Sequence, residues 1–283
     1  GGVAGLAGSY YYEQAVANPN PVVSVLIAMV CAILCAAFGA LIYSVLTITL
    51  RANQNVTGLA LTIFGTGFAN FLGEAIGNTA PSRYMAVGNV TKNAFNSGIP
   101  GLQDLPVVGK LLFSYNFMVY LGIILAIVLA WFLGRSRAGL NLRSVGESPA
   151  TADAAGINVT VYKYLATCIG GGICGLGGLY IVMNSANGVG GVWVHNCVNG
   201  KGWIAVALVI FATWSPARAL LGSLVFGALS VMRLYVALGI PAQIYDIFPY
   251  IATVIVLVAV SMRRKRENQP PQSLGLAFYR EER

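Results

Sequence analysis

Residues 22–50 read VVSVLIAMVCAILCAAFGALIYSVLTITL and contain no charged side chain. A helix of this length rises about 40 Å, whereas roughly 20 apolar residues suffice to cross the hydrocarbon core of a bilayer. The run therefore predicts a membrane-spanning helix. The whole chain agrees with this prediction, because 57% of its 283 residues are hydrophobic and 9% are charged, against about a quarter charged in a soluble domain. We expect an all-α fold, a polytopic bundle of transmembrane helices.

Further candidate membrane segments follow this run in the sequence. Apolar stretches of sufficient length occupy residues 56–72, 117–134, 161–183 and 217–238, with a shorter one at 247–261. The run GWIAVALVIFATW at 202–214 is different, because as a helix it reaches about 20 Å of a core about 30 Å thick. It predicts a short helix that is broken, re-entrant or buried in protein.

The basic residues predict the orientation, since short cytoplasmic loops collect Lys and Arg. If Arg51 is cytoplasmic, alternation places residues 73–116 and 184–201 outside and the basic C-terminal tail, 263–283, inside. The other basic residues on the inner side are then Arg135, Arg137, Arg143 and Arg218. The net charge of +8 is thus a signal of topology, and we expect contact with membrane lipid rather than nucleic acid.

The first residues, GGVAGLAGSYYYEQ, contain neither an initiator Met nor the pattern of a signal peptide. They resemble the outer end of an earlier span. We therefore expect further residues upstream of this sequence.

The sequence contains no pattern typical of catalysis. It has no phosphate-binding loop, no H-E-x-x-H and no C-x-x-C pair, and its five cysteines are scattered. His195 is the one histidine and has no carboxylate near it in sequence. The glycines of GGGICGLGG, 170–178, lie in an apolar run, where small residues allow close helix packing. We therefore predict neither an enzyme nor a metal or cofactor site in this chain.

One polar segment, GLNLRSVGESPATADAAGI at 139–157, interrupts the apolar pattern on the predicted cytoplasmic side. Ser148 as N-cap, Pro149 at the first helical position, Asp153 inside and Gly156 at a left-handed C-terminus predict a short helix. Residues 137–145 predict a second short helix that Gly146 ends. The residue pattern alone leaves two interpretations open, a structured loop and a docking site for another protein.

Three separated stretches resemble a known family. They are GLNLRSVGESPATADAAGINVTVYKYLATCIGGGICGLGGLY at 139–180, GKGWIAVALVIFATWSPARALLGSLVFG at 200–227, and LGLAFYREER at 274–283. They resemble permease subunits of bacterial ABC importers, in the branch that includes ribose and branched-chain amino-acid permeases. The likeness is greatest to nucleoside-importer permeases, specifically the smaller of two that pair with each other. Such proteins usually begin with two further apolar stretches, which this chain lacks or retains only as residues 1–14.

This resemblance implies a division of labour between subunits. Residues 1–262 would form the transmembrane permease domain, and a partner ATPase would bind ATP and Mg and hydrolyse the ATP. The residues that would couple the permease to that ATPase are Gly146, Glu147, Ser148, Pro149, Asp153 and Gly156. A second permease subunit and an extracytoplasmic substrate-binding lipoprotein would complete an importer in the bacterial cytoplasmic membrane. The alternatives are a permease for sugars or branched-chain amino acids, or a secondary transporter, which should carry a membrane-embedded carboxylate.

Polar side chains at membrane depth are candidates for the solute path, because a polar solute needs hydrogen-bond partners there. The candidates in this chain are Asn53, Gln54, Asn70, Asn184, Asn187, Asn196, Asn199 and Trp203. Each asparagine alone also fits a helix cap or a loop hydrogen bond. An amide-rich path with aromatic walls and no buried carboxylate fits a nucleoside better than an amino acid.

Overall fold

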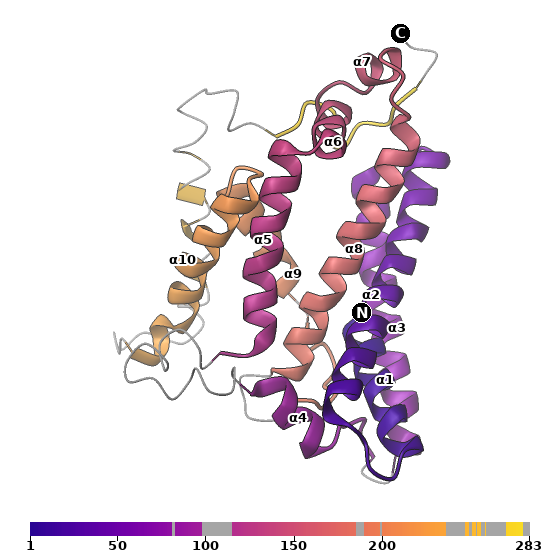
Figure 1. The fold of residues 1–283 in the computed structure, drawn as a ribbon, viewed down its shortest axis with the longest axis vertical. Coiled ribbons are helices and arrows are strands. Elements are labelled where there is room, and N and C mark those ends of the chain that lie inside the picture. The colour runs from indigo at the N-terminus through magenta and orange to yellow at the C-terminus, as the bar shows by residue number, and fades with distance from the viewer. Residues whose placement is uncertain are drawn as a thin grey trace. The chain divides into compact units, whose positions relative to one another are not determined.

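A computed structural model describes residues 1–80, 83–97, 115–184, 190–198, 200–235, 247–248, 251–252, 254–255, 258 and 270–279. In these ranges the regular elements are helices, apart from one isolated antiparallel bridge between Ala86 and Val192 (Figure 1). The prediction of an all-α fold is confirmed. The chain divides into two compact units. The first unit comprises Gly1–Leu121, Ser148–Asn199 and Gly275–Arg283, and the second comprises Gly122–Glu147 and Gly200–Leu274.

Four of the described helices are long and apolar enough to cross a membrane. They are α2 (Pro21–Ser44) with its π-helical continuation η1 (Val45–Thr49), α3 (Gln54–Thr79), α5 (Phe117–Arg135) and α8 (Val159–Met183). These helices confirm the first four predicted spans.

The helix α3 is longer than predicted at both ends. It begins at Gln54 because the Asn53 side chain accepts hydrogen bonds from the backbone N–H groups of Asn55 and Val56. It continues past residue 72 to Thr79 because backbone hydrogen bonding does not depend on apolar side chains. Its last turns are buried at Gly73 and Gly77.

The core of the first unit is the packing of α1 (Gly2–Ala15), α2 and α8. Small residues let the three backbones approach closely. A Cβ atom on Gly175 of α8 would lie 2.5 Å from the Ala32 carbonyl oxygen, and one on Gly5 would lie 2.8 Å from the Ala28 carbonyl oxygen. Leu179 is fully buried between these helices. The predicted packing role of the glycine run in α8 is confirmed.

The two ends of the first unit differ in structure. We term the end with Arg51 and residues 148–158 the inner end, after the predicted orientation, and the opposite end the outer end. At the outer end, α4 (Asn89–Asn96) is held by Glu13, whose carboxylate accepts hydrogen bonds from the Gly88 N–H at 2.6 Å and from the Thr91 hydroxyl. Residues 85–87 also pair with 191–193 there.

The second unit contains the rest of α5, α6 (Arg137–Glu147), α9 (Lys201–Phe211) and α10 (Pro216–Tyr235). The helix α9 confirms the predicted short helix at 202–214. It ends at Phe211 because Thr213 and Trp214 adopt left-handed backbone angles, φ 48° and 55°, before α10 begins. The rings of Phe211 and Phe226 meet edge to face at 5.4 Å between centroids. Most of the predicted span 247–261 lies outside the described residues.

Candidate functional site

The predicted short helix of the polar segment is present as α7 (Pro149–Ala154). Ser148 precedes it with φ −145° and ψ 92°, and Pro149 takes the first helical position. Ser148 caps this helix only through its backbone carbonyl, which accepts from the Ala152 N–H at 3.0 Å. Its hydroxyl lies 2.7 Å from the Thr151 hydroxyl and makes no cap hydrogen bond. The prediction of Ser148 as the N-cap residue is therefore confirmed in position, although its hydroxyl lies against the Thr151 hydroxyl and not against a helix N–H.

The C-terminus of α7 has the predicted left-handed geometry. Gly156 has φ +83°, and its N–H donates to the Asp153 carbonyl at 3.0 Å. The Ile157 N–H donates to the Ala152 carbonyl, also at 3.0 Å. These two bonds satisfy carbonyls that the helix end would otherwise leave open. The chain then enters α8 directly, because the Asn158 side chain accepts from the Val161 N–H at 3.1 Å.

The preceding helix, α6, does not end where the sequence predicts. It continues through Gly146 to Glu147, so the prediction that Gly146 ends it at residue 145 is wrong. The end comes at Ser148 because a residue before proline is driven from helical into extended backbone angles. Gly146 is instead a contact point, since its carbonyl accepts from the Ser273 N–H at 3.2 Å.

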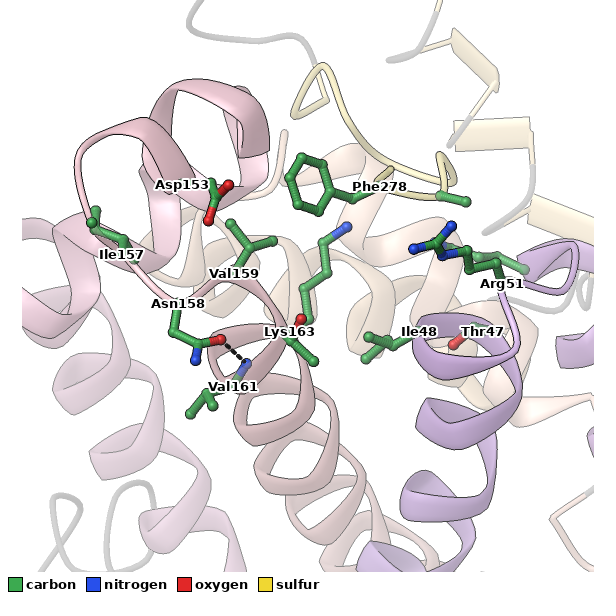
Figure 2. Close-up of a pocket in the computed structure, with 14 residues that line it drawn as sticks. Thr47, Ile48, Arg51, Asp153, Ile157, Asn158, Val159, Val161, Lys163 and Phe278 are labelled. Atoms are coloured by element: carbon green, nitrogen blue, oxygen red, sulfur yellow. Dashed lines mark hydrogen bonds between the residues drawn. The ribbon is translucent and has the colours of Figure 1, made fainter. Parts of the chain in front are cut away.

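A cavity of about 570 Å³ lies beside the α7–α8 turn at the inner end of the first unit (Figure 2). Arg51, in the turn between η1 and α3, and Lys163 of α8 line it, together with Phe278 of the C-terminal segment. The Lys163 ammonium points toward the Phe278 ring, 5.9 Å from its centroid. The Arg51 guanidinium lies 4.6 Å from the centroid of the Tyr279 ring. Two cation–π contacts thus hold residues 278–279 against the inner ends of α2 and α8.

The predicted solute-path residues at this end have structural roles. Asn53 caps α3. The Gln54 side-chain amide donates to the Leu276 carbonyl at 3.4 Å, which adds a third contact to the C-terminal segment. Neither residue lies near the other predicted asparagines of the first unit, because Asn70 is sixteen positions, or about 24 Å, farther along α3.

Near the outer end the structure brings two predicted residues together. The Asn70 side-chain amide donates to the Asn196 side-chain oxygen at 2.9 Å, and the Asn196 backbone N–H donates back to Asn70 at 3.2 Å. Asn184 terminates α8, and its amide donates to the Tyr180 hydroxyl at 2.8 Å. Asn187 and Asn199 lie outside the described residues. Trp203 is exposed at the start of α9 in the second unit.

Two residues beside this amide pair were not predicted as site residues from the sequence. His195 Nε2 lies 4.0 Å from Glu74 Oε2, and both side chains are largely exposed. The signal that could have found Glu74 is its spacing of four from Asn70, which places both on one helix face. Within the described ranges, no group of three His, Cys, Asp or Glu side chains could hold a metal ion.

These features define the class of protein. Long apolar helices, with a short apolar helix and a short polar helix between spans, make this chain a multi-pass membrane protein. Residues 1–257 match the family described as branched-chain amino acid transport system / permease component. The chain belongs to this family, and it is a permease subunit of an ABC transport system.

Several relatives have names that include a solute. The guanosine ABC transporter permease protein NupQ of Bacillus subtilis is 35% identical over 257 residues, which cover 87% of this chain and 75% of the relative. The nucleoside ABC transporter permease protein NupC of Lactococcus lactis is 34% identical over 236 residues, 78% of this chain and 70% of the relative.

A third relative, from Haloferax volcanii, is the candidate glucose ABC transporter permease protein TsgC13. It is 36% identical over 200 residues, which cover 69% of this chain. The match spans 56% of the length of that relative. No solved structure matches the chain.

Proposed function

We propose that this chain is the permease subunit through which an ATP-driven importer moves nucleosides across the bacterial cytoplasmic membrane. The observation that carries the proposal is the similarity to guanosine and nucleoside permeases over 87% and 78% of the chain. A nucleoside combines a stackable base with a ribose rich in hydroxyls. The paired amides of Asn70 and Asn196 offer hydrogen-bonding groups suited to such a neutral solute.

The short helix α7 is the proposed contact with a partner ATPase, which binds ATP and Mg and hydrolyses the ATP. Two features support this role. The helix has defined geometry at both ends, Pro149 at the start and Gly156 at the finish. It also joins α8 through a turn that two backbone bonds and the Asn158 cap hold. A displacement of α7 by the ATPase therefore moves α8 with it as a rigid body, because the turn between the two helices is fixed.

The other proposed partners follow from the class. An extracytoplasmic binding lipoprotein delivers the solute to the outer end, and a second permease subunit completes the path. The residues proposed for the coupling contact remain those predicted from sequence, Gly146 to Pro149 together with Asp153 and Gly156.

Sugar import is the second candidate, because the Haloferax relative named for glucose is 36% identical over 69% of this chain. Glucose and ribonucleosides share the chemistry of a neutral, hydroxyl-rich solute. The two candidates therefore make similar demands on a polar path, and only transport measurements separate them.

An uptake assay tests the proposal. Cells that lack their own nucleoside importers receive this chain with its partner subunits, and labelled guanosine, uridine, glucose and leucine are supplied in turn. We expect nucleosides to accumulate, and a hydrolysis-deficient partner ATPase to abolish the accumulation. Accumulation of glucose or leucine without any nucleoside would refute nucleoside import while preserving the importer class.

A further inference from the structure

The helix α3 carries a polar stripe that the proposed function has only partly used. Thr62, Thr66, Asn70 and Glu74 recur at every fourth position, so their side chains share one face of the helix. The most apolar window of α3 has a mean hydropathy of 1.4, the lowest among the four long spans. Amide and carboxylate groups facing hydrocarbon are costly. This face is therefore suited to a hydrated path rather than to lipid.

The stripe covers about 18 Å, more than half of a hydrocarbon core. Measured from Gln54 at 1.5 Å per residue, Thr62 lies at about 12 Å and Glu74 at about 30 Å, the thickness of a hydrocarbon core. The Thr62 and Thr66 hydroxyls donate to backbone carbonyls one turn earlier, each at 2.8 Å. Each hydroxyl oxygen still has lone pairs that can accept from a solute. The stripe thus leads from the membrane interior to a carboxylate at the outer boundary.

At its outer end, the stripe is met by residues 190–198. This segment is anchored by the backbone N–H of Trp193, which donates to the Met85 carbonyl at 2.9 Å. Asn196 holds a left-handed backbone, φ 56°, while its N–H and side chain both bond Asn70. The result is that His195 lies 4.0 Å from Glu74. Asn70 and Asn196 act as positioning residues for this pair.

The indole of Trp193 is buried against the outer part of α3. Trp193 is 9% exposed, and its Nε1–H has no hydrogen-bond partner among the described residues. The indole lies against Gly73, the residue before Glu74, where a Cβ atom would stand 2.1 Å from Nε1. A buried donor without a hydrogen-bond partner costs free energy unless a bound group or water pairs with it.

We propose that Glu74 and His195, positioned by Asn70 and Asn196, form a site that binds the vicinal hydroxyls of the solute at the outer mouth of the path. We term these four residues the diol site. An ionised carboxylate is an acceptor with two oxygens, so Glu74 can accept from both hydroxyls of a cis-diol, such as the 2′ and 3′ hydroxyls of a ribonucleoside. His195 orients the carboxylate. The inference rests on the proposed function for its substrate class.

The test compares guanosine with 2′-deoxyguanosine, which differs by the loss of one hydroxyl of the diol. The complete transporter is reconstituted in proteoliposomes with its binding protein saturated by either nucleoside. Glu74→Gln keeps the size of the side chain and removes its charge. We expect the uptake rate of guanosine to fall about tenfold relative to that of 2′-deoxyguanosine, the size of a charged hydrogen bond. An equal effect on both nucleosides, or no effect, overturns the diol site.

A second variant tests the same inference if Glu74→Gln does not assemble. The His195 side chain is 56% exposed, so His195→Gln should fold, and it should lower the same uptake ratio; an unchanged ratio overturns the inference. If the wild-type transporter moves glucose and no nucleoside, nucleoside import fails separately. The same variants are then compared with glucose and 2-deoxyglucose. A lower uptake rate of glucose relative to 2-deoxyglucose supports the diol site, and an unchanged ratio overturns it.

Discussion

Replacing Gly156 by valine tests whether the end of α7 transmits the ATPase signal. Gly156 has φ +83°, and a Cβ atom there would meet no neighbour within 4 Å. The cost is therefore one of backbone conformation and not of packing. A left-handed residue with a side chain costs about 1–2 kcal/mol, and a β-branched residue is among the least tolerant. That cost depopulates the native turn by roughly 5- to 30-fold, since 1.4 kcal/mol is tenfold.

The assay is ATP hydrolysis by the assembled complex in proteoliposomes, with and without solute-loaded binding protein. We expect Gly156→Val to lose most of the stimulation by the binding protein. Gly156→Asn is the matched control, because asparagine tolerates left-handed angles, and it should remain close to wild type. Full stimulation of an assembled valine variant would refute the reasoning, as would an asparagine variant impaired to the same degree.

Three further predictions concern the packing, the C-terminal segment and the topology. Gly175→Val should reduce the free energy of unfolding by about 1–3 kcal/mol more than Gly177→Val, because only the former clashes with a neighbouring backbone. The measurement is the thermal unfolding temperature in detergent, and equal shifts for the two variants would contradict the α2–α8 packing. Tyr279→Ala should speed proteolysis of the C-terminal segment by removing a cation–π contact of about 0.5–1 kcal/mol, and Tyr279→Phe should not. In a cysteine-free background, Tyr84→Cys should react with an impermeant thiol reagent from outside and Leu274→Cys only after the membrane is opened; labelling of both in intact cells would reverse this topology.

Local sequence signals predicted the two helices of the coupling segment and both ends of α7 correctly. Pro149 and Gly156 act through their own backbone preferences, so their positions could be read without knowledge of the fold. Ser148 is also at the predicted N-cap position, but the partner of its hydroxyl could not be predicted, because that hydroxyl lies 2.7 Å from the Thr151 hydroxyl and makes no bond to a helix N–H. Gly146 was misread as a terminator, since glycine weakens a helix without ending it.

The candidate solute path, in contrast, could not be predicted from local sequence signals. A single asparagine in sequence fits a cap, a loop or a path, and the structure assigns Asn53 to a cap and pairs Asn70 with Asn196. Glu74 lies two residues beyond the predicted span 56–72, and His195 has no carboxylate near it in sequence. Their approach depends on the segment 190–198 lying over the end of α3.

What the sequence by itself determined is the set of properties that depend on composition and near neighbours. These are the membrane class, the positions of the first four spans and the short polar helix α7, because hydrophobic transfer and backbone preferences act residue by residue. Only the tertiary structure decided which distant groups meet. The pairing of Asn70 with Asn196 and the contact of Arg51 with Tyr279 join residues far apart in the chain, and such contacts follow from the packing of whole helices, which no local pattern encodes.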